Sequence, residues 1–210
     1  MLKVLVVDDS PLFRRGVRDL LVEGLQGVKI GEAGNAQEML DLLRRKPWDV
    51  AVLDISMPGM NGLDALKHVK EEFPDLPVLI LSMYPEEQYA IRMIKAGADG
   101  YLTKSSTPEE LLSAIQKVHG GGTYVSPSLG EALAFTIKSG AEKNPHELLS
   151  DREYQVLCLV GSGKTAGEIA GMTNLSVTTI STYRARILGK MRMKTNAELA
   201  RYAIQQGLVE

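Results

Sequence analysis

Short apolar runs alternate with helix-like segments over the first 120 residues, and this alternation limits the possible folds more than any other feature of the sequence. The runs that predict strands cover residues 2–7, 28–33, 50–53, 78–81 and 100–102. Their apolar character is almost uninterrupted, which is typical of strands buried on both faces of a parallel sheet. We therefore expect an α/β domain with a doubly wound, five-stranded parallel sheet.

A different pattern follows residue 120. Residues 121–146 contain several glycines and prolines and predict a linker with one short helix at 129–138. Beyond the linker we find no strand pattern, and helix starts are indicated by three capping boxes and one further cap: Ser150 with Glu153, Thr165 with Glu168, Thr195 with Glu198, and Ser176. The sequence thus predicts a domain at 1–120, the linker at 121–146 and an all-α domain at 147–210.

The overall charge of −2 hides a local excess of cations. Between residues 164 and 194 the only acidic residue is Glu168, and the basic ones are Lys164, Arg184, Arg186, Lys190, Arg192 and Lys194. Such a stripe indicates a polyanionic partner. The single cysteine, Cys158, excludes an intramolecular disulfide, and no signal segment or membrane-spanning run is apparent. We expect a cytoplasmic protein that does not associate with membranes.

Acidic residues follow two of the predicted strands. Asp8 and Asp9 come after the first strand and Asp54 after the third, and the carboxyl ends of these strands meet at one edge of a doubly wound sheet. Three carboxylates in one pocket repel each other unless a hard divalent cation neutralises them, and oxygen ligands of this kind suit Mg²⁺. A carboxylate bound to metal can also act as a nucleophile toward phosphorus.

Two further strand ends point to phosphate chemistry. Ser82 ends the fourth strand, where its hydroxyl can bond a phosphoryl oxygen, and Lys104 follows the fifth strand with a point charge for the same group. A single Asp after a strand is more often a helix cap. The joint occurrence of all five residues at strand ends favours a phosphate site instead.

The first 120 residues resemble the receiver domains of two-component response regulators. The resemblance rests on VVDD at 6–9, LDISMPGMNG at 53–62, LS at 81–82 and GADGYLTK at 97–104. It implies that Asp54 accepts a phosphoryl group from a sensor histidine kinase, and that Mg²⁺ binds Asp9, Asp54 and the Ser56 carbonyl, with Asp8 bound through water. It further implies a switch pair, Ser82 and Tyr101, with Lys104 as the phosphate partner; Tyr101 taken alone could equally be a half-buried strand aromatic.

The segment 176–193 predicts the recognition helix of a helix-turn-helix. On a helical wheel the apolar arc contains Val177, Ile180, Ile187, Leu188 and Met191. The opposite arc contains Thr178, Thr182, Ala185, Arg186 and Gly189. Small outward residues let a helix enter the major groove of DNA, while basic residues at its edges neutralise phosphates.

Residues 147–208 are similar to the luxR-type domain of the NarL/FixJ subfamily, through LSxRE at 149–153, GEIA at 167–170, LSxxTI at 175–180 and AELA at 197–200. The run TYRAR at 182–186 is more like the branch that contains GacA and UvrY. The resemblance implies double-stranded DNA as a partner, a homodimer on phosphorylation or on DNA, and base-facing residues near Ser181, Thr182 and Ala185. Residues near phosphates would be Thr179, Tyr183, Arg186 and Lys190, while Arg184 could reach a phosphate or bond within the domain.

Two alternatives compete with a phosphorylation-controlled, non-enzymatic regulator. GSGKT at 161–165 could belong to a nucleotide-binding loop, but the full motif requires glycine where Cys158 stands and a strand before it. A regulator that acts by protein contact without phosphate is the other alternative, against which the complete set of pocket residues counts.

Overall fold

The computed structural model describes residues 1–57, 60, 62–84, 86–127, 129–131, 144–173 and 175–209. It consists of two compact units, Met1–Gly130 and Glu131–Glu210. The predicted linker helix at 129–138 is helical at 129–131, and its remainder lies outside the described residues.

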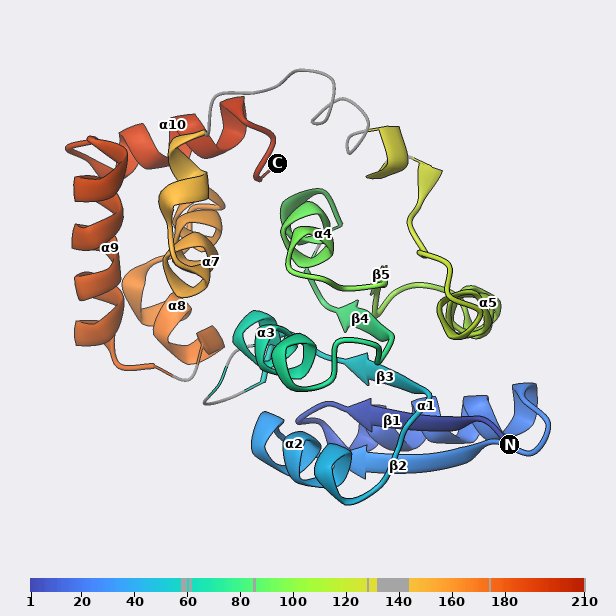
Figure 1. Ribbon diagram of the computed structural model, residues 1–210. Helices are drawn as coiled ribbons and strands as arrows, with labels where there is room; N and C mark the ends of the chain where they lie inside the picture. Colours follow the sequence, from blue (N-terminus) through green and yellow to red (C-terminus); the bar gives the residue numbers. More distant parts are fainter. Residues whose placement is uncertain are drawn as a thin grey trace. The chain divides into compact units, whose positions relative to one another are not determined.

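The first unit is built on a parallel sheet (Figure 1). Within the described residues its strands are β1 (Lys3–Val7), β2 (Lys29–Ala33), β3 (Val50–Leu53), β4 (Val78–Ser82) and β5 (Gly100–Thr103), in the order β2-β1-β3-β4-β5. Every pair of neighbours is parallel. The direction of strand order reverses at β1, which is the switch point where such sheets bind ligands. The predicted doubly wound α/β fold is confirmed.

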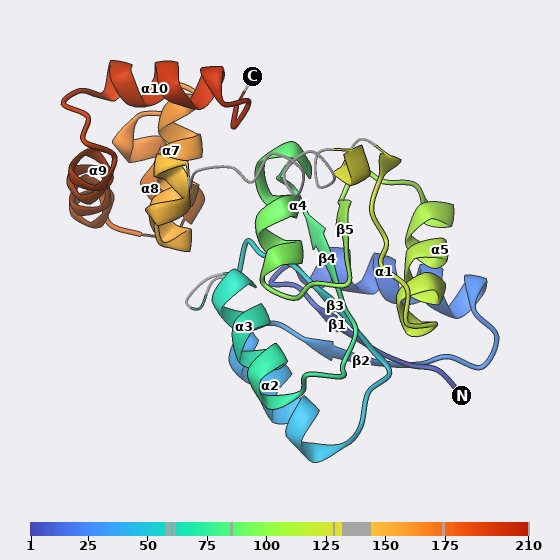
Figure 2. The same cartoon turned by 45° about the horizontal axis from the view of Figure 1, so that its top comes forward.

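Helices cover both faces of this sheet (Figure 2). The helices α1 (Pro11–Gly24) and α5 (Pro108–His119) pack on one face, and α2 (Ala36–Arg45), α3 (Gly62–Glu72) and α4 (Glu86–Lys95) lie on the other. Val6, Val52 and Leu81 point from the strands into a fully apolar layer with Leu21 and Ile115 from the helices. Burial of both sheet faces explains the uninterrupted apolar runs of the sequence.

Local capping places the first helices. Ser10 caps α1 by accepting a hydrogen bond from the Phe13 N–H, and Pro11 begins that helix. Thr107 and Glu110 form a reciprocal capping box at the start of α5. These caps start each helix close to the carboxyl edge of the sheet, so the side chains of the first helical turns face that edge.

The second unit is helical within the described residues. It contains the short 3₁₀ helix η1 (Pro145–Leu148) and the helices α7 (Asp151–Gly161), α8 (Ala166–Thr173), α9 (Val177–Met191) and α10 (Asn196–Gln205). The predicted capping boxes form at Ser150 and Thr195, and Ser176 caps α9. The helix α7 packs against α9 and α10, and α8 packs against α9, which forms the helix-turn-helix. In the described part of the chain, none of the helices has the length and apolar character needed to cross a membrane.

Candidate functional site

Three carboxylates meet at the carboxyl edge of the sheet. Val7 pairs with Leu53, so the residues that follow them, Asp8 and Asp54, leave the sheet side by side. Both are buried, each only 2% exposed, whereas Asp9 is exposed. Oxygens from these two acids and from Asp9 lie within 4.8 Å of one another. The structure thus brings together the three acids, as the switch-point argument predicts.

The ammonium of Lys104 lies between two of these acids. Its Nζ is 2.5 Å from Oδ2 of Asp8 and 2.8 Å from Oδ2 of Asp54. The Lys104 backbone N–H donates a 2.7 Å hydrogen bond to the carbonyl of Ser82, which fixes the side chain beside the end of β4. The Phe13 ring lies 4.4 Å from the ammonium, within the range of a cation–π interaction. One largely dehydrated cation is therefore shared by two buried carboxylates.

The pocket has an excess of negative charge. Burial raises the pKa of Asp54 above its ordinary value, and hydrogen bonding to Lys104 opposes this only in part. Burial lowers the pKa of Lys104, but hydrogen bonds to Asp54 and Asp8 outweigh that effect and the net pKa is raised. Lys104 therefore remains an ammonium ion. Since one cation faces three acids, the pocket favours a further cationic partner.

Ser82 and Tyr101 are connected through the backbone of Tyr84. The Tyr84 N–H donates a 3.0 Å hydrogen bond to Oγ of Ser82, and the Tyr101 hydroxyl donates a 2.9 Å hydrogen bond to the Tyr84 carbonyl. Ser82 is 0% exposed and Tyr101 is 1% exposed. Burial raises the pKa of the Tyr101 phenol, which keeps it a hydrogen-bond donor. Tyr101 is thus fully buried, not half-buried.

Ser56 and Arg14 add polar groups to the pocket. The Ser56 N–H donates to Oδ1 of Asp54 at 3.0 Å, and the Ser56 hydroxyl is buried without a hydrogen-bond partner among the described residues. Arg14 donates a 2.5 Å hydrogen bond to the Asp8 carbonyl, and its Nε lies 3.6 Å from Glu32. Sequence reasoning missed Arg14 because a cation on α1 resembles an ordinary surface residue. Arg14 lies one helical turn after the cap residue Ser10, which directly follows Asp8 and Asp9. This spacing is the sequence signal that places Arg14 close to the acids.

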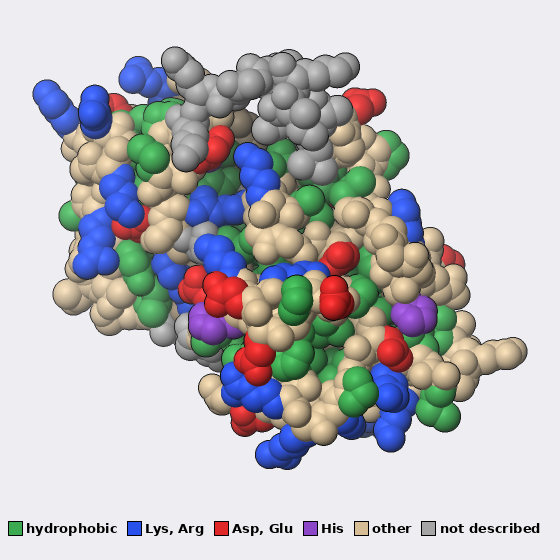
Figure 3. Space-filling view, viewed as in Figure 1, with side chains coloured by type: hydrophobic (Ala, Val, Ile, Leu, Met, Phe, Trp, Pro, Cys, Tyr) green, Lys and Arg blue, Asp and Glu red, His purple; other side chains and the backbone are tan. Residues whose placement is uncertain are grey.

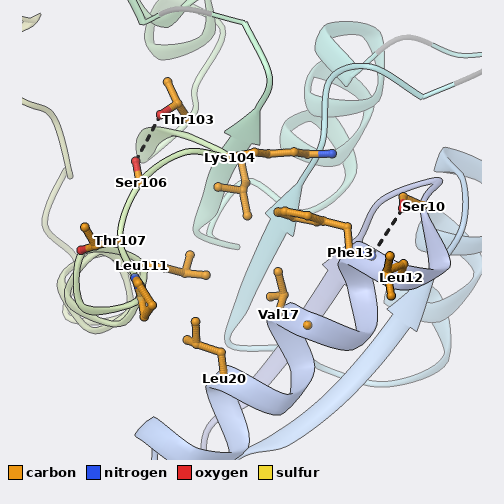
Figure 4. A pocket seen from close by; sticks show the side chains of 13 residues that line it. Ser10, Leu12, Phe13, Val17, Leu20, Thr103, Lys104, Ser106, Thr107 and Leu111 are labelled. Carbon is orange, nitrogen blue, oxygen red and sulfur yellow. Dashed lines mark hydrogen bonds between the residues drawn. The ribbon is translucent and has the colours of Figure 1, made fainter.

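A cavity of about 420 Å³ opens between α1 and α5, next to Lys104. Figure 4 shows Phe13 and Val17 of α1 pointing toward Leu111 of α5, so that the cavity wall is largely apolar. Hydroxyl groups of Thr103, Ser106 and Thr107 lie on its rim with Lys104. Lys104 therefore connects the acidic pocket with this cavity.

The helix α9 presents a polar surface. Ile180, Ile187 and Met191 are buried, as the helical wheel predicts. The polar and small residues exposed on this helix are Thr178, Ser181, Thr182, Ala185, Arg186, Gly189 and Lys190. The wheel is wrong for Val177, which is 51% exposed because it begins the helix, where neighbouring helices do not cover it.

The other predicted DNA-contacting residues differ in their surroundings. Oγ1 of Thr179 lies 2.8 Å from Oγ of Ser176 at the helix cap. Tyr183 and Arg184 are half-buried. Arg184 makes no hydrogen bond or ion pair within the described part of the chain, so an internal partner for it, one of the two alternatives, is not found there.

Lys190 has a partner inside the second unit. Its ammonium lies 2.6 Å from Oε2 of Glu153, whose side chain is 3% exposed. Glu153 also closes the capping box with Ser150. Burial raises the pKa of Glu153, but hydrogen bonds from Lys190 and Ser150 outweigh this and the net pKa is lowered. This ion pair connects α9 to the start of α7.

The segment 161–165 follows a helix. α7 ends at Gly161, where a nucleotide-binding loop would follow a strand. The Thr165 N–H donates a 2.8 Å hydrogen bond to Glu168 in a helix cap. Cys158 is 2% exposed and fills the core of the unit. The local structure at 161–165 is therefore not that of a nucleotide-binding loop, and the nucleotide-binding interpretation is wrong.

Two family models match the chain. The model of the response regulator receiver domain matches residues 4–116. The model of bacterial regulatory proteins of the luxR family matches residues 147–203. The matches fall on the unit with the acidic pocket and on the helix-turn-helix, respectively.

Relatives resemble the chain along its whole length. Response regulator UvrY of Escherichia coli K12 is 34% identical over 210 residues, covering 99% of this chain and 96% of UvrY. Response regulator GacA of Pseudomonas aeruginosa PAO1 is 36% identical over 213 residues, covering 100% and 99%. The similarity to this branch is thereby confirmed.

Solved structures agree with the family matches. RcsB of Salmonella enterica serovar Typhimurium, bound to promoter rprA in the presence of phosphomimetic BeF₃⁻, is 26% identical with a TM-score of 0.62, covering 96% of this chain and 98% of that chain. A LuxR-family two-component response regulator from Aurantimonas is 34% identical with a TM-score of 0.58, covering 63% of this chain and 94% of that chain. The chain therefore belongs to the luxR-family response regulators of two-component signal transduction systems, which are DNA-binding transcription regulators.

Proposed function

We propose that Asp54 accepts a phosphoryl group from the phosphohistidine of a sensor histidine kinase, and that phosphorylation controls transcription through binding of α9 to double-stranded DNA. The observation that carries this proposal is the buried Asp54 carboxylate, 2.8 Å from the Lys104 ammonium and close to Asp8 and Asp9. The family to which the chain belongs supports the same assignment.

The transfer needs few protein groups. A carboxylate oxygen of Asp54 attacks phosphorus, a P–O bond forms, and the P–N bond to the kinase imidazole breaks with its electron pair leaving on nitrogen. Lys104 then exchanges its contact with Asp54 for a phosphoryl oxygen, as a mobile point charge can. The protein performs no turnover of its own in this scheme, which makes it a phosphorylated regulator and not an enzyme.

The residues present fit a magnesium ion. Three carboxylates supply hard oxygen ligands, and the buried Ser56 hydroxyl lacks a partner among the described residues. Asp9, Asp54 and the Ser56 carbonyl would hold Mg²⁺, with Asp8 bound through water. The ion supplies positive charge that neutralises the acids and the incoming phosphoryl oxygens.

Ser82 and Tyr101 form the proposed switch. A phosphoryl oxygen on Asp54 accepts a hydrogen bond from the Ser82 hydroxyl, and turning that hydroxyl toward Asp54 moves Oγ away from the Tyr84 N–H that donates to it. Loss of that hydrogen bond frees the β4–α4 connection, and Tyr101 changes its contact with the same Tyr84 backbone. The switch thereby converts one covalent change into movement of a surface segment.

For DNA recognition we propose two classes of contact on α9. Ser181, Thr182 and Ala185 face bases, since they are exposed and small enough for close approach. Thr179, Tyr183, Arg186 and Lys190 lie near phosphates; Arg184 is assigned to the same class. Lys190 would contact a DNA phosphate through the same ammonium group that forms the ion pair with Glu153.

We further propose a receiver domain at 1–120, a linker at 121–146 and a DNA-binding domain at 147–210, with a homodimer forming on phosphorylation or on DNA. Because its proposed ligand is DNA, the protein acts in the cytoplasm.

The test uses acetyl phosphate and Mg²⁺ as phosphoryl donor and metal. One phosphoryl group per chain is expected by intact mass, and none in Asp54→Asn. Asp41→Asn is the matched control, because Asp41 is an exposed acid on α2. Phosphorylation should raise DNA affinity by roughly 5–150-fold, and DNA should shift the phosphorylation equilibrium toward the phosphorylated form by the same factor. Undiminished phosphorylation of Asp54→Asn would contradict the assignment.

A further inference from the structure

A second cationic surface lies away from the exposed α9 positions. A groove of about 330 Å³ runs between the turn after α9 and one face of α10, lined by Arg192, Lys194, Glu198, Arg201, Tyr202 and Gln205. We call it the α10 groove. Figure 3 shows Lys and Arg side chains gathered over the region of α9 and α10. Three cations face one carboxylate in this groove.

Among the described residues, the cations of the α10 groove interact with one carboxylate, Glu198, which attracts Lys194 and Arg201 without forming an ion pair with either. Within the described part of the chain, Arg192, Lys194 and Arg201 make no ion pair. Oε2 of Glu198 accepts hydrogen bonds from the backbone N–H groups of Lys194 and Thr195, so it serves as the cap of α10. Lys190, in contrast, pairs with buried Glu153. Since three cations face this one carboxylate, the groove keeps a net positive charge.

The backbone at Arg192 indicates that its side chain has a use. Its φ is 56°, and among the described non-glycine residues it alone has a positive φ. Glycine adopts this left-handed conformation at helix ends without steric cost, whereas a residue with a Cβ atom does not. The backbone therefore favours glycine at a position where the chain carries the longest cationic side chain.

Helix length brings the groove to the edge of DNA. α9 has 15 residues, which corresponds to roughly 22 Å at about 1.5 Å per residue. The major groove of B-DNA is about 12 Å wide. When residues 181–186 face bases, the C-terminal end of α9 extends past the groove toward the phosphate backbone. Arg192 immediately follows that end.

We infer that Arg192, Lys194 and Arg201 bind phosphate groups of duplex DNA on the backbone that borders the major groove entered by α9. The inference rests on the proposed DNA binding and adds a contact surface outside the recognition helix. Such contacts are independent of base sequence and position the helix in the groove.

The experiment measures affinity of the full chain for a mixed-sequence DNA duplex across a range of salt concentrations. The variants are Arg192→Gly, Lys194→Gln, Arg201→Gln and the triple variant. Arg45→Gln is the control of equal charge change, since Arg45 is exposed on α2 and has no ion pair among the described residues. Each lost contact should reduce the slope of log affinity against log salt by about 0.9. Arg45→Gln should leave the slope unchanged.

Arg192→Gly separates binding from folding. Its thermal midpoint should equal or exceed that of the wild type, since glycine suits φ of 56°. A reduced slope with an undiminished midpoint supports the inference. Unchanged slopes in all four variants, with wild-type DNA binding intact, would overturn it. If Arg192→Gly abolishes pyrophosphate binding but leaves the salt dependence of DNA affinity unchanged, the groove is a site for small anions and the inference is overturned. If the wild-type protein fails to bind DNA, the proposed function itself is contradicted.

Discussion

The Lys104 ammonium lies 2.8 Å from Oδ2 of Asp54, and it is the same ammonium that contacts Asp8. Two buried acids therefore depend on one cation. Removing a buried charge from such a set relieves repulsion, whereas removing the cation would leave both acids uncompensated. The acidic pocket is thus arranged for ligand binding at a cost in stability.

Asp54→Asn should stabilise the protein in the absence of Mg²⁺. Asn keeps the shape of the side chain and leaves Asp8 paired with Lys104, so the free energy of unfolding should rise by about 1 kcal/mol. Urea denaturation measures this change. Added Mg²⁺ should stabilise the wild type more than the variant, because the ion binds the intact acid set more tightly. A variant less stable than the wild type without Mg²⁺ would refute the account of the pocket.

Tyr101→Phe should separate phosphorylation from its effect. Asp54 and Lys104 remain in place, so acetyl phosphate should still modify the variant at a similar rate. The Tyr84 carbonyl loses its 2.9 Å hydrogen bond, which should lower the free energy of unfolding by about 1 kcal/mol. The gain in DNA affinity on phosphorylation should shrink, as measured by fluorescence anisotropy before and after modification. An unchanged gain would exclude Tyr101 from the switch.

Arg186→Ala should weaken binding to every DNA sequence alike. Arg186 is exposed on α9, and loss of one phosphate contact should lower the salt slope by about one unit. Thr182 substitutions should instead change sequence preference, since Thr182 is assigned to bases. Anisotropy titrations on several duplexes distinguish these effects. If Arg186→Ala leaves both the DNA affinity and its salt slope unchanged, this face of α9 does not contact DNA.

The ion pair of Glu153 and Lys190 should make the second unit sensitive to acid. The pKa of Glu153 is lowered on folding, so its stabilising contribution is present above the unfolded value of about 4.3 and is lost as pH falls through the folded value. Glu153→Gln keeps a residue able to complete the cap but removes the charge. Hydrogen exchange in α7 should show about 1–2 kcal/mol lower stability for the variant at neutral pH. The difference in stability between the variant and the wild type should vanish at a pH below the pKa of Glu153 in the folded protein. A difference that persists at that pH would argue against a stabilising ion pair.

Local signals in the sequence determined most of the architecture. Strand patterns place β1 to β5 within about a residue of their observed bounds, because apolar runs bury both sheet faces wherever they occur. Capping at Thr107, Ser150 and Thr195 depends on residues three positions apart, so sequence spacing alone predicts it. The cluster of Asp8, Asp9 and Asp54 follows from strand order at the switch point.

Tertiary structure alone decided how individual charges are used. Glu153 and Lys190 are 37 positions apart in the sequence, and Asp54 and Lys104 are 50 positions apart, so neither ion pair has a local sequence signal. Packing of α9 on α7 makes the first pair, and strand order combined with the path of the Lys104 side chain makes the second. Arg192 and Arg201 share a groove for the same reason. Local preferences act within a turn of chain, whereas ion pairs and grooves form only when distant elements pack together.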